Sequence, residues 1–477
     1  MPNLIGLDLG TTTITGVLLD PGRSEVLCLA RRRNDAAIPQ AQPNRAEQDP
    51  HRLRTLALEV LAELALSDQP IEGIALTGQM HGLLCVDAEA SPLSPLISWQ
   101  DQRTGETLSG GTTLLDQLHI RLEDLDWRRN GCRIAHGYGA ATLFWFVQQG
   151  ALPPGTNRVC TIADWLAGQL AGRAPVTDPT FAASWGIYNL VDGTWNAAFL
   201  DRLGLDAWLF PLVRPSGEKL GGLAPQMARE VGLPAGVPVF NALGDTQASF
   251  LGSIALSSDR QESHDQGGDL AQSVFFNLGT GGQICWVVPC FEVPTGSVET
   301  RPLSPDRYLR VGASLCGGAA YAWLKDTVRA WLVDFGVEVD EQVVYERLNA
   351  MAAECDSIRG LRVRTTFLGS RGDPSVVTGS IEGITLENLQ LGALARATLT
   401  GIVDELHGLY RTHAGESIHH RQVVATGGGV RQNPLMPALI QERFDLPVWI
   451  PPQPETAALG AAVSAHCDPT LLLGRRS

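Results

Sequence analysis

Two turns rich in glycine and threonine, each following a short apolar stretch, carry residue types that bind phosphate. The first follows Asp8 and the second follows Asn277, about 270 residues further along the chain. Backbone N–H groups and threonine hydroxyls in such turns can contact phosphate oxygens, and a neighbouring carboxylate can hold a hydrated magnesium ion. Either turn alone could be an ordinary hairpin, but the pair predicts two similar domains that hold one polyphosphate across a cleft. The expected phosphate-binding residues are Gly10, Thr11, Thr12, Thr13, Gly279, Thr280 and Gly281, with Asp8 holding the metal through water.

A carboxylate at the end of an apolar stretch is the candidate catalytic base. Asp245 follows the run 237–240 and the short segment Asn241–Gly244. In α/β folds the chemistry gathers at the ends of strands. A carboxylate there can accept the proton of a substrate hydroxyl during phosphoryl transfer. The alternative is that Asp245 caps a helix, with Gln247 in its first turn.

Two polar clusters could bind a polyol, which needs several hydrogen bonds and a flat apolar face for its C–H side. They are the segments 77–82 (TGQMHG) and 98–103 (SWQDQR). The first could also hold a structural histidine, and in the second the arginine could simply pair with the aspartate. The candidate substrate residues are Gln79, Met80, His81, Trp99, Asp101 and Arg103.

A third glycine-rich segment follows the apolar run 422–426. Three consecutive glycines, 427–429, leave bare backbone against which a flat ring such as adenine can lie. We expect Asn433 to cap a helix whose first residue is Pro434. A flexible loop leading into that helix, with no ligand, is the alternative.

The overall composition excludes several classes of protein. The chain has 477 residues, a formal net charge of −15 and 44% hydrophobic residues, which predicts folded domains rather than disorder. Strong acidity argues against a nucleic acid or a membrane as partner. Lys219 and Lys325 are the only lysines and neither lies in a GxxxxGK[ST] pattern, so a P-loop is excluded. The chain shows no signal peptide, no long apolar run and no CxxC among its nine cysteines, so we expect a cytoplasmic protein with reduced thiols.

The secondary structure expected around these motifs alternates between strands and helices. Apolar runs at 4–9 and 14–19 predict a hairpin, and further strands are expected at 25–30 and 71–76. Apolar positions at helical spacing predict a helix over 51–66. The pattern indicates an α/β fold. The polar stretch 256–272 is interpreted as an exposed loop near the boundary between two domains.

The chain resembles the FGGY family of carbohydrate kinases over essentially its whole length. The motifs that carry the resemblance are GLDLGTT (6–12), GQMHG (78–82), SWQDQR (98–103), GDTQ (244–247), NLGTGG (277–282), GASLCGGAAYAW (312–323), TFLGSRGDP (366–374) and ATGGGVRQNP (425–434). The resemblance implies two actin-like domains of the ribonuclease-H type around a nucleotide and sugar cleft. Residues 1–252 would bind the sugar and residues 253–477 most of the nucleotide.

The resemblance also implies the chemistry. ATP and Mg²⁺ would be the cofactors and a sugar hydroxyl the acceptor, with Asp245 as general base and Asp8 beside the metal. A rival function that shares the phosphate turns, an actin-like or chaperone-like ATPase, would not need the two polyol segments. The additional nucleotide contacts implied are Gly317, Gly318, Gly428, Gly429 and Asn433.

The substrate branch is inferred from short segments. Glycerol kinases carry Arg-Glu where this chain has Met80-His81, and GQMHG is instead similar to the sedoheptulokinases and xylulokinases, whose substrates are ketoses. Residues 137–145 and 183–189 resemble the sedoheptulokinases more. We therefore expect D-sedoheptulose as substrate, phosphorylated at its C7 hydroxyl, with D-xylulose as the alternative; the oligomeric state stays open, a homodimer being one possibility. Further lining of the sugar pocket is expected from Ser184, Trp185 and Asn189, although Trp185 could equally be core.

Overall fold

We analysed a computed structural model of the chain. It describes residues 3–23, 25–67, 69–108, 110–255, 272–369, 378–415 and 419–466. We call residues 3–255 the N-terminal half and residues 272–466 the C-terminal half. Apart from Gln272, the loop expected at 256–272 lies outside the described residues, and so does the end of the 366–374 motif. No helix in the described ranges is both long and apolar enough to cross a bilayer.

A seven-stranded sheet organises the described part of the N-terminal half. Its order is β12-β13-β6-β1-β2-β3, and β14 also pairs with β6. The predicted hairpin and strands are confirmed, and β3 and β6 run further than expected. The strands are β1 (Asn3–Leu9), β2 (Thr13–Asp20), β3 (Glu25–Arg33), β6 (Ile71–Gly78), β12 (Lys219–Gly222), β13 (Pro238–Phe240) and β14 (Leu243–Gly244).

A six-stranded sheet organises the C-terminal half, in the order β17-β18-β16-β15-β21-β22 among the described residues. Its strands are β15 (Ser273–Leu278), β16 (Gly282–Val288), β17 (Val298–Ser304), β18 (Arg307–Ser314), β21 (Gln422–Thr426) and β22 (Val448–Trp449). The short strands outside the two sheets are β4 (Ala37–Ile38), β5 (Glu47–Gln48), β7 (Leu84–Val86), β8 (Leu96–Ile97), β9 (Arg158–Cys160), β10 (Tyr188–Asn189), β11 (Thr194–Trp195), β19 (Arg362–Arg364) and β20 (Ser380–Glu382).

The two sheets repeat one pattern of pairing. In the first, β1 is antiparallel to β2, β2 is antiparallel to β3, and β1 is parallel to β6, which is parallel to β13. In the second sheet, β15 is antiparallel to β16, β16 is antiparallel to β18, and β15 is parallel to β21, which is parallel to β22. The repeat predicted from two turns therefore extends over five strands. The α/β fold with two similar domains is confirmed.

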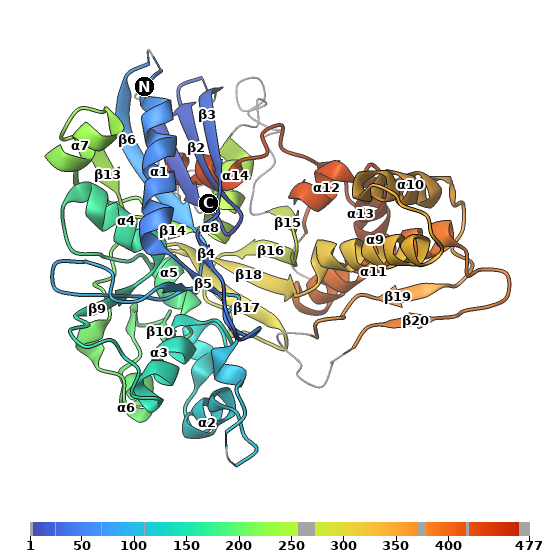
Figure 1. Cartoon of the computed structure of the whole chain (residues 1–477), viewed down its shortest axis with the longest axis horizontal. Helices are drawn as coiled ribbons and strands as arrows, with labels where there is room; N and C mark the ends of the chain where they lie inside the picture. Colours follow the sequence, from blue (N-terminus) through green and yellow to red (C-terminus); the bar gives the residue numbers. More distant parts are fainter. Residues whose placement is uncertain are drawn as a thin grey trace.

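Helices cover both sheets (Figure 1). The α-helices are α1 (Pro50–Ala65), α2 (Leu114–Arg121), α3 (Gly139–Gln148), α4 (Ile162–Ala171), α5 (Pro179–Ser184), α6 (Ala197–Leu203), α7 (Pro225–Val231), α8 (Asp245–Ala255), α9 (Gly317–Asp334), α10 (Glu341–Glu354), α11 (Leu391–His413), α12 (Gly428–Gln432), α13 (Met436–Phe444) and α14 (Thr456–His466). Three 3₁₀ turns in the described residues are η1 (Arg103–Gly105), η2 (Trp127–Asn130) and η3 (Ala207–Leu209).

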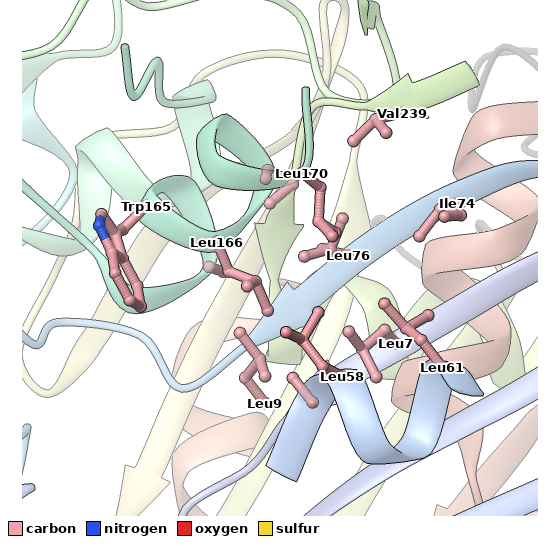
Figure 2. Packing of buried hydrophobic residues seen from close by; sticks show 14 of the residues in the cluster. Leu7, Leu9, Leu58, Leu61, Ile74, Leu76, Trp165, Leu166, Leu170 and Val239 are labelled. Carbon is pink, nitrogen blue, oxygen red and sulfur yellow. The ribbon is translucent and has the colours of Figure 1, made fainter. Parts of the chain in front are cut away.

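The core of the N-terminal half fixes the strand that carries Asp8. Helix α1 begins where the Asp49 side chain accepts a hydrogen bond from the backbone N–H of His51. Its leucines pack on the leucines of β1, and α4 packs on the neighbouring strand β6 (Figure 2). The labelled side chains that meet there include Leu7, Leu9, Leu58, Leu61, Leu76 and Leu166.

Helices α8 and α14 join the two halves. A Cβ built on Gly252 would lie 1.9 Å from the carbonyl oxygen of Thr456, and one on Gly460 would lie 1.8 Å from that of Ala248. The C-terminal helix also packs on the first sheet, because a Cβ on Gly6 would lie 1.8 Å from the Ala458 carbonyl oxygen. Glycine at these positions is what allows the backbones to approach so closely.

Candidate active site

The first phosphate turn is held by side chains from elsewhere in the N-terminal half. The Asn34 Nδ2 group donates to the carbonyl oxygens of Gly10 and Thr11, each at 3.0 Å. The Trp99 indole Nε1 donates to Thr11 Oγ1 at 3.0 Å. Thr12 lies in the turn and Thr13 is the first residue of β2. Trp99 therefore links the predicted polyol segment to the predicted phosphate turn.

The second phosphate turn rests on the start of α9, an 18-residue helix. The backbone N–H of Gly318 donates to the Gly279 oxygen, and that of Ala319 to the Thr280 oxygen, both at 3.0 Å. A Cβ on Gly317 would lie 2.2 Å from the carbonyl carbon of Gly281, so only glycine fits there. The turn is thus placed at the positive end of a helix, where anions are stabilised.

A cavity of about 470 Å³ opens beside this second turn. Of the predicted nucleotide residues, it is lined by Gly279, Thr280, Gly318, Gly428, Gly429 and Asn433. Sequence reasoning missed the opposite wall, formed by α9 and α10. Its lining includes Tyr321, Lys325, Glu341, Gln342 and Tyr345.

Two of these missed residues carry polar groups suited to a ligand. The Tyr321 hydroxyl is buried and has no hydrogen-bond partner among the described residues. Lys325 forms ion pairs with Glu341 and, at 3.2 Å, with Asp326. Tyr321 belongs to the GASLCGGAAYAW motif, so that motif was a signal for it. Glu341 and Tyr345 lie on a helix without any such motif.

The glycine-rich segment differs in detail from the expectation. Helix α12 begins directly at Gly428, and the positive φ of 91° belongs to Gly427. Asn433 is not the N-cap of a helix starting at Pro434: it ends α12, and α13 begins only at Met436. Its extended backbone separates two short helices. Its side chain accepts from Leu435 N–H at 3.1 Å and donates to Asn349 Oδ1 at 2.9 Å.

The two predicted carboxylates both have raised pKa values, and the charge of one of them, Asp245, acts on the other, Asp8. Burial and, to a smaller extent, the charges of Asp245 and Glu455 together raise the pKa of Asp8 to about 8. Burial likewise raises the pKa of Asp245 to about 6. Asp8 lies near the end of β1 and Asp245 at the start of α8. The arrangement brings together two carboxylates whose proton affinities differ, as an acid–base site requires.

Asp8 has the properties of a residue that helps to hold Mg²⁺. Its Oδ1 atom is shielded from solvent and has no hydrogen-bond partner among the described residues. Nor do these residues contain a cluster of three or more His, Cys, Asp or Glu side chains that could bind a metal alone. Magnesium characteristically uses one or two carboxylates together with substrate phosphates and water. Asp8 Oδ1, a carboxylate oxygen without a partner among the described residues and close to a phosphate turn, fits that requirement.

The segment that carries Asp245 is tethered to both halves. The Gly244 N–H donates to Thr180 Oγ1 at 2.7 Å, within the N-terminal half. The Gln247 Nε2 group donates to the Pro302 carbonyl oxygen at 3.0 Å, in the C-terminal half. The Thr246 hydroxyl lies 3.3 Å from Asp245 Oδ1 and 3.4 Å from Gln283 Oε1. Helix α8 begins at Asp245, so Asp245 is its first residue and not the cap before it, while Gln247 lies in the first turn as the alternative interpretation proposed.

The first polyol segment is held in a strained conformation. His81 has a φ of 72°, a value that residues other than glycine rarely adopt. Its N–H donates to Ser184 Oγ at 3.1 Å, and its Nδ1 lies 2.6 Å from the Ser184 carbonyl oxygen. Because a carbonyl oxygen only accepts, Nδ1 carries the proton. Met80 is buried beside it, and the Gln79 amide donates to Gln48 Oε1 at 2.8 Å while its own Oε1 lacks a partner among the described residues.

The second polyol segment contains the ion pair that its alternative interpretation proposed. Arg103 Nε donates to Asp101 Oδ1 at 2.7 Å, and Arg103 Nη2 donates to Glu47 Oε1 at 2.7 Å. Asp101 Oδ2 also accepts from the Ala46 N–H at 2.8 Å. Both side chains are buried. Their polar atoms, in the same segment of sequence as Trp99, bond to one another and to residues 46 and 47.

The three residues expected to extend the sugar pocket lie in different environments. Trp185 belongs to the core: it is 1% exposed, packs against Trp195, and donates to the Gly82 oxygen at 3.3 Å. Asn189 is bonded to Asp192 within a turn. Of the three, Ser184 contacts a predicted substrate residue, His81. Trp185 and Asn189 make structural contacts, and their expected lining of the sugar pocket stays a prediction.

Comparison with known proteins identifies the family. The model of the FGGY carbohydrate kinase N-terminal domain matches residues 3–252, and that of the C-terminal domain matches residues 273–467. The sedoheptulokinase of Homo sapiens is 29% identical over 97% of both chains. The glycerol kinase of Thermus brockianus is 28% identical over 97% of this chain and 89% of its own.

A solved structure agrees in fold. The xylulose kinase of Lactobacillus acidophilus superposes with a TM-score of 0.83 at 22% identity, over 100% of this chain and 91% of its own. Together with the two family models, which cover most of the sequence, this identifies the chain as a member of the FGGY family of carbohydrate kinases, and so as a sugar phosphotransferase.

Proposed function

We propose that this enzyme transfers the γ-phosphoryl group of ATP to a ketose, D-sedoheptulose, giving sedoheptulose 7-phosphate. The observation that carries the phosphotransferase chemistry is the proximity of Asp245 to Asp8, which lies near the end of the strand before the first phosphate-type turn, together with the contact of Thr246 to Gln283, just after the second turn. The ketose assignment is supported by Met80-His81 in place of the Arg-Glu of glycerol kinases, and by the sedoheptulokinase among the relatives.

Asp245 is the proposed general base. With a pKa of about 6, its carboxylate is ionised at neutral pH yet basic enough to accept a proton from a hydroxyl. Gly244 is held from the N-terminal half, and Thr246 and Gln247 are held from the C-terminal half, which positions the carboxylate before the reaction. Loss of the proton makes the sugar oxygen the nucleophile.

The phosphate chain is proposed to lie between the two turns. Gly10 to Thr13 would contact it from the N-terminal half, and Gly279 to Gly281 from the C-terminal half. Fixed N–H and hydroxyl donors in such turns stabilise charge that develops on the transferring group. A magnesium ion held near Asp8 would neutralise phosphate charge when bound. The division at residue 252, with the sugar bound before it and the nucleotide mostly after it, is part of this proposal.

The adenine is proposed to occupy the cavity of about 470 Å³. A Cβ on Gly428 would have Gln432 Nε2, at 3.9 Å, as its nearest neighbour, so this glycine presents bare backbone to open space. The Tyr321 hydroxyl, which has no hydrogen-bond partner in the described part of the chain, supplies a polar group for the ligand. These features support a flat ring lying on the start of α12.

The sugar is proposed to lie among Gln79, Met80, His81 and Trp99, with its acceptor hydroxyl toward Asp245. Gln79 Oε1, to which no described residue donates a hydrogen bond, can accept one from a sugar hydroxyl. Asp101 and Arg103 lie in the same segment as Trp99, and direct contact of these two residues or of Trp185 with the sugar stays a prediction. Membership of a carbohydrate kinase family argues against the function of an actin-like ATPase.

A coupled assay of ADP formation across sedoheptulose, xylulose, ribulose, fructose and glycerol tests the substrate. We expect the highest kcat/KM for D-sedoheptulose, with the phosphate on C7 in the ³¹P NMR spectrum of the product. A site that hydrogen-bonds additional hydroxyls discriminates against shorter analogues. A higher kcat/KM for D-xylulose would leave a ketose kinase but overturn the sedoheptulose assignment, and glycerol as best acceptor would overturn both.

A further inference from the structure

An arginine from the C-terminal half reaches into the substrate end of the N-terminal half. Arg301 lies on β17 and is 4% exposed. Its Nη1 donates to the Ala183 carbonyl oxygen at 2.7 Å, and its Nη2 donates to the Tyr138 hydroxyl oxygen at 3.0 Å. Glu299, on the same strand, accepts from Arg301 Nε at 3.0 Å and from Nη2 at 2.6 Å.

Both of these contacts lead to His81. The Tyr138 ring stacks on the His81 imidazole, with centroids 4.2 Å apart and planes 15° from parallel. Its hydroxyl donates to Glu299 Oε1 at 2.9 Å, so the ring is held from the C-terminal half. Ala183 precedes Ser184, whose hydroxyl and carbonyl oxygen hold the backbone and the ring of His81.

The strained backbone of His81 makes such support necessary. A non-glycine residue at φ 72° persists only where its surroundings determine it from several sides. A buried guanidinium is expensive unless its donors are satisfied, and Arg301 uses its donors on one carbonyl, one hydroxyl and one carboxylate. Packing of β17 alone would not require a buried charge whose donors are directed to these groups.

We propose that Arg301 is a positioning residue for the sugar end of the active site, holding His81 through Tyr138 and through the 183–184 backbone. Because Arg301 belongs to the C-terminal half, it also couples the arrangement of the two halves to the geometry of the sugar pocket. The inference rests on the proposed location of the sugar beside His81, but not on which sugar is bound.

A second buried arginine on the neighbouring strand provides a matched control. Arg310 lies on β18 and is 2% exposed. Its hydrogen-bond partners among the described residues lie within residues 292–300 of the C-terminal half: it donates to the Val293 carbonyl oxygen at 3.1 Å and to Thr300 Oγ1 at 2.7 Å, among others. It therefore matches Arg301 in burial and charge but makes none of these contacts to the sugar end.

The test compares Arg301→Lys, Tyr138→Phe, their double variant and Arg310→Lys. The acceptor is whichever sugar the wild-type enzyme uses best, so an error in the sedoheptulose assignment does not affect the result. We expect Arg301→Lys to raise the KM for sugar, and the Kd for sugar in calorimetry, about tenfold or more, with the KM for ATP unchanged within twofold. The double variant should be no worse than the poorer single variant, because both changes break one linkage.

Arg310→Lys should lower Tm without separating the two KM values. If Arg301→Lys behaves in the same way, lowering Tm with both KM values unchanged, the positioning role is wrong. Additive effects of Arg301→Lys and Tyr138→Phe would also contradict it. Should Arg301→Lys fail to fold, Glu299→Gln removes the charge that holds Arg301 while keeping its shape, and an unchanged sugar KM in that variant would overturn the proposal.

Discussion

Asp245 lies close enough to Asp8 for its negative charge to raise the pKa of Asp8. The two residues come from different elements, the end of β1 and the start of α8. They meet because β14, which precedes α8, pairs with β6, the neighbour of β1. This proximity predicts how activity and stability respond to pH and to Mg²⁺.

The pH dependence of turnover should follow Asp245. Because its pKa is about 6, the proton-accepting carboxylate is depleted below that pH. We expect kcat at saturating ATP, Mg²⁺ and sugar to fall about tenfold for each unit of pH below 6 and to level off above 7. An acid limb positioned near pH 4 would contradict a buried base.

The stability of the ligand-free enzyme should depend on pH through Asp8. Its folded-state pKa of about 8 exceeds the ordinary value of 3.8, so the folded state binds this proton more tightly than the unfolded state. This contribution to stability is complete below pH 4 and is lost as pH rises toward 8. We therefore expect Asp8→Asn, without Mg²⁺, to have a higher Tm than the wild type at pH 8 and the same Tm at pH 4.

The same variant should lose activity. Asp8→Asn removes the carboxylate proposed to hold hydrated Mg²⁺, and we expect kcat to fall at least about 100-fold. In the wild type, the Mg²⁺ concentration for half-maximal rate should rise as pH falls below 8, since protons and metal compete for one oxygen. A wild-type Mg²⁺ requirement independent of pH between 6 and 8 would show that Asp8 does not serve the metal.

The nucleotide cavity can be tested at Gly428. Valine there would meet no close atom and would project into open space, so Gly428→Val should raise the KM for ATP at least about tenfold while the KM for sugar changes less than twofold. Gly408→Val is the control, because Gly408 also has open space around it but lies in α11 and does not line the cavity. Equal rises in both KM values for Gly428→Val would indicate a structural role.

The close approach of α8 and α14 predicts a loss of stability. Gly460→Ala would place a Cβ 1.8 Å from a backbone oxygen, which forces the helices apart. We expect a loss of about 1–3 kcal/mol in unfolding free energy, measured by denaturant titration. Gly408→Ala, with nothing within 4 Å, should instead be neutral or slightly stabilising. Equal stability of the two variants would contradict the packing described.

Sequence patterns predicted those elements whose conformation is determined by short segments of the chain. The glycine–threonine turns and the strands around them depend on backbone conformations that short segments determine, and both sheets contain them as expected. Only the two turns of the five-stranded repeat could be recognised in the sequence, because strands such as β22 are short and carry no motif.

Contacts between distant segments could not be predicted. Arg103 pairs with Asp101, as the alternative proposed, but its second partner Glu47 lies 56 residues away. The sequence around Trp185 does not distinguish a residue that lines a pocket from one that fills a core. Its place in the core is seen from the packing of Trp195 against it. The Arg301 contacts cross from one half to the other, which no spacing in the sequence reveals.

The most direct test of the central claim is sugar-dependent ADP formation by Asp245→Asn beside the wild-type enzyme. The substitution keeps the size of the side chain but removes the proton acceptor. We predict that wild-type ADP formation requires a ketose and that the variant loses about 10²–10⁴-fold in kcat, with its Tm not lowered and its Kd for ATP retained. Wild-type kcat in the variant, or equal ADP formation by the wild type without any sugar, would contradict the claim.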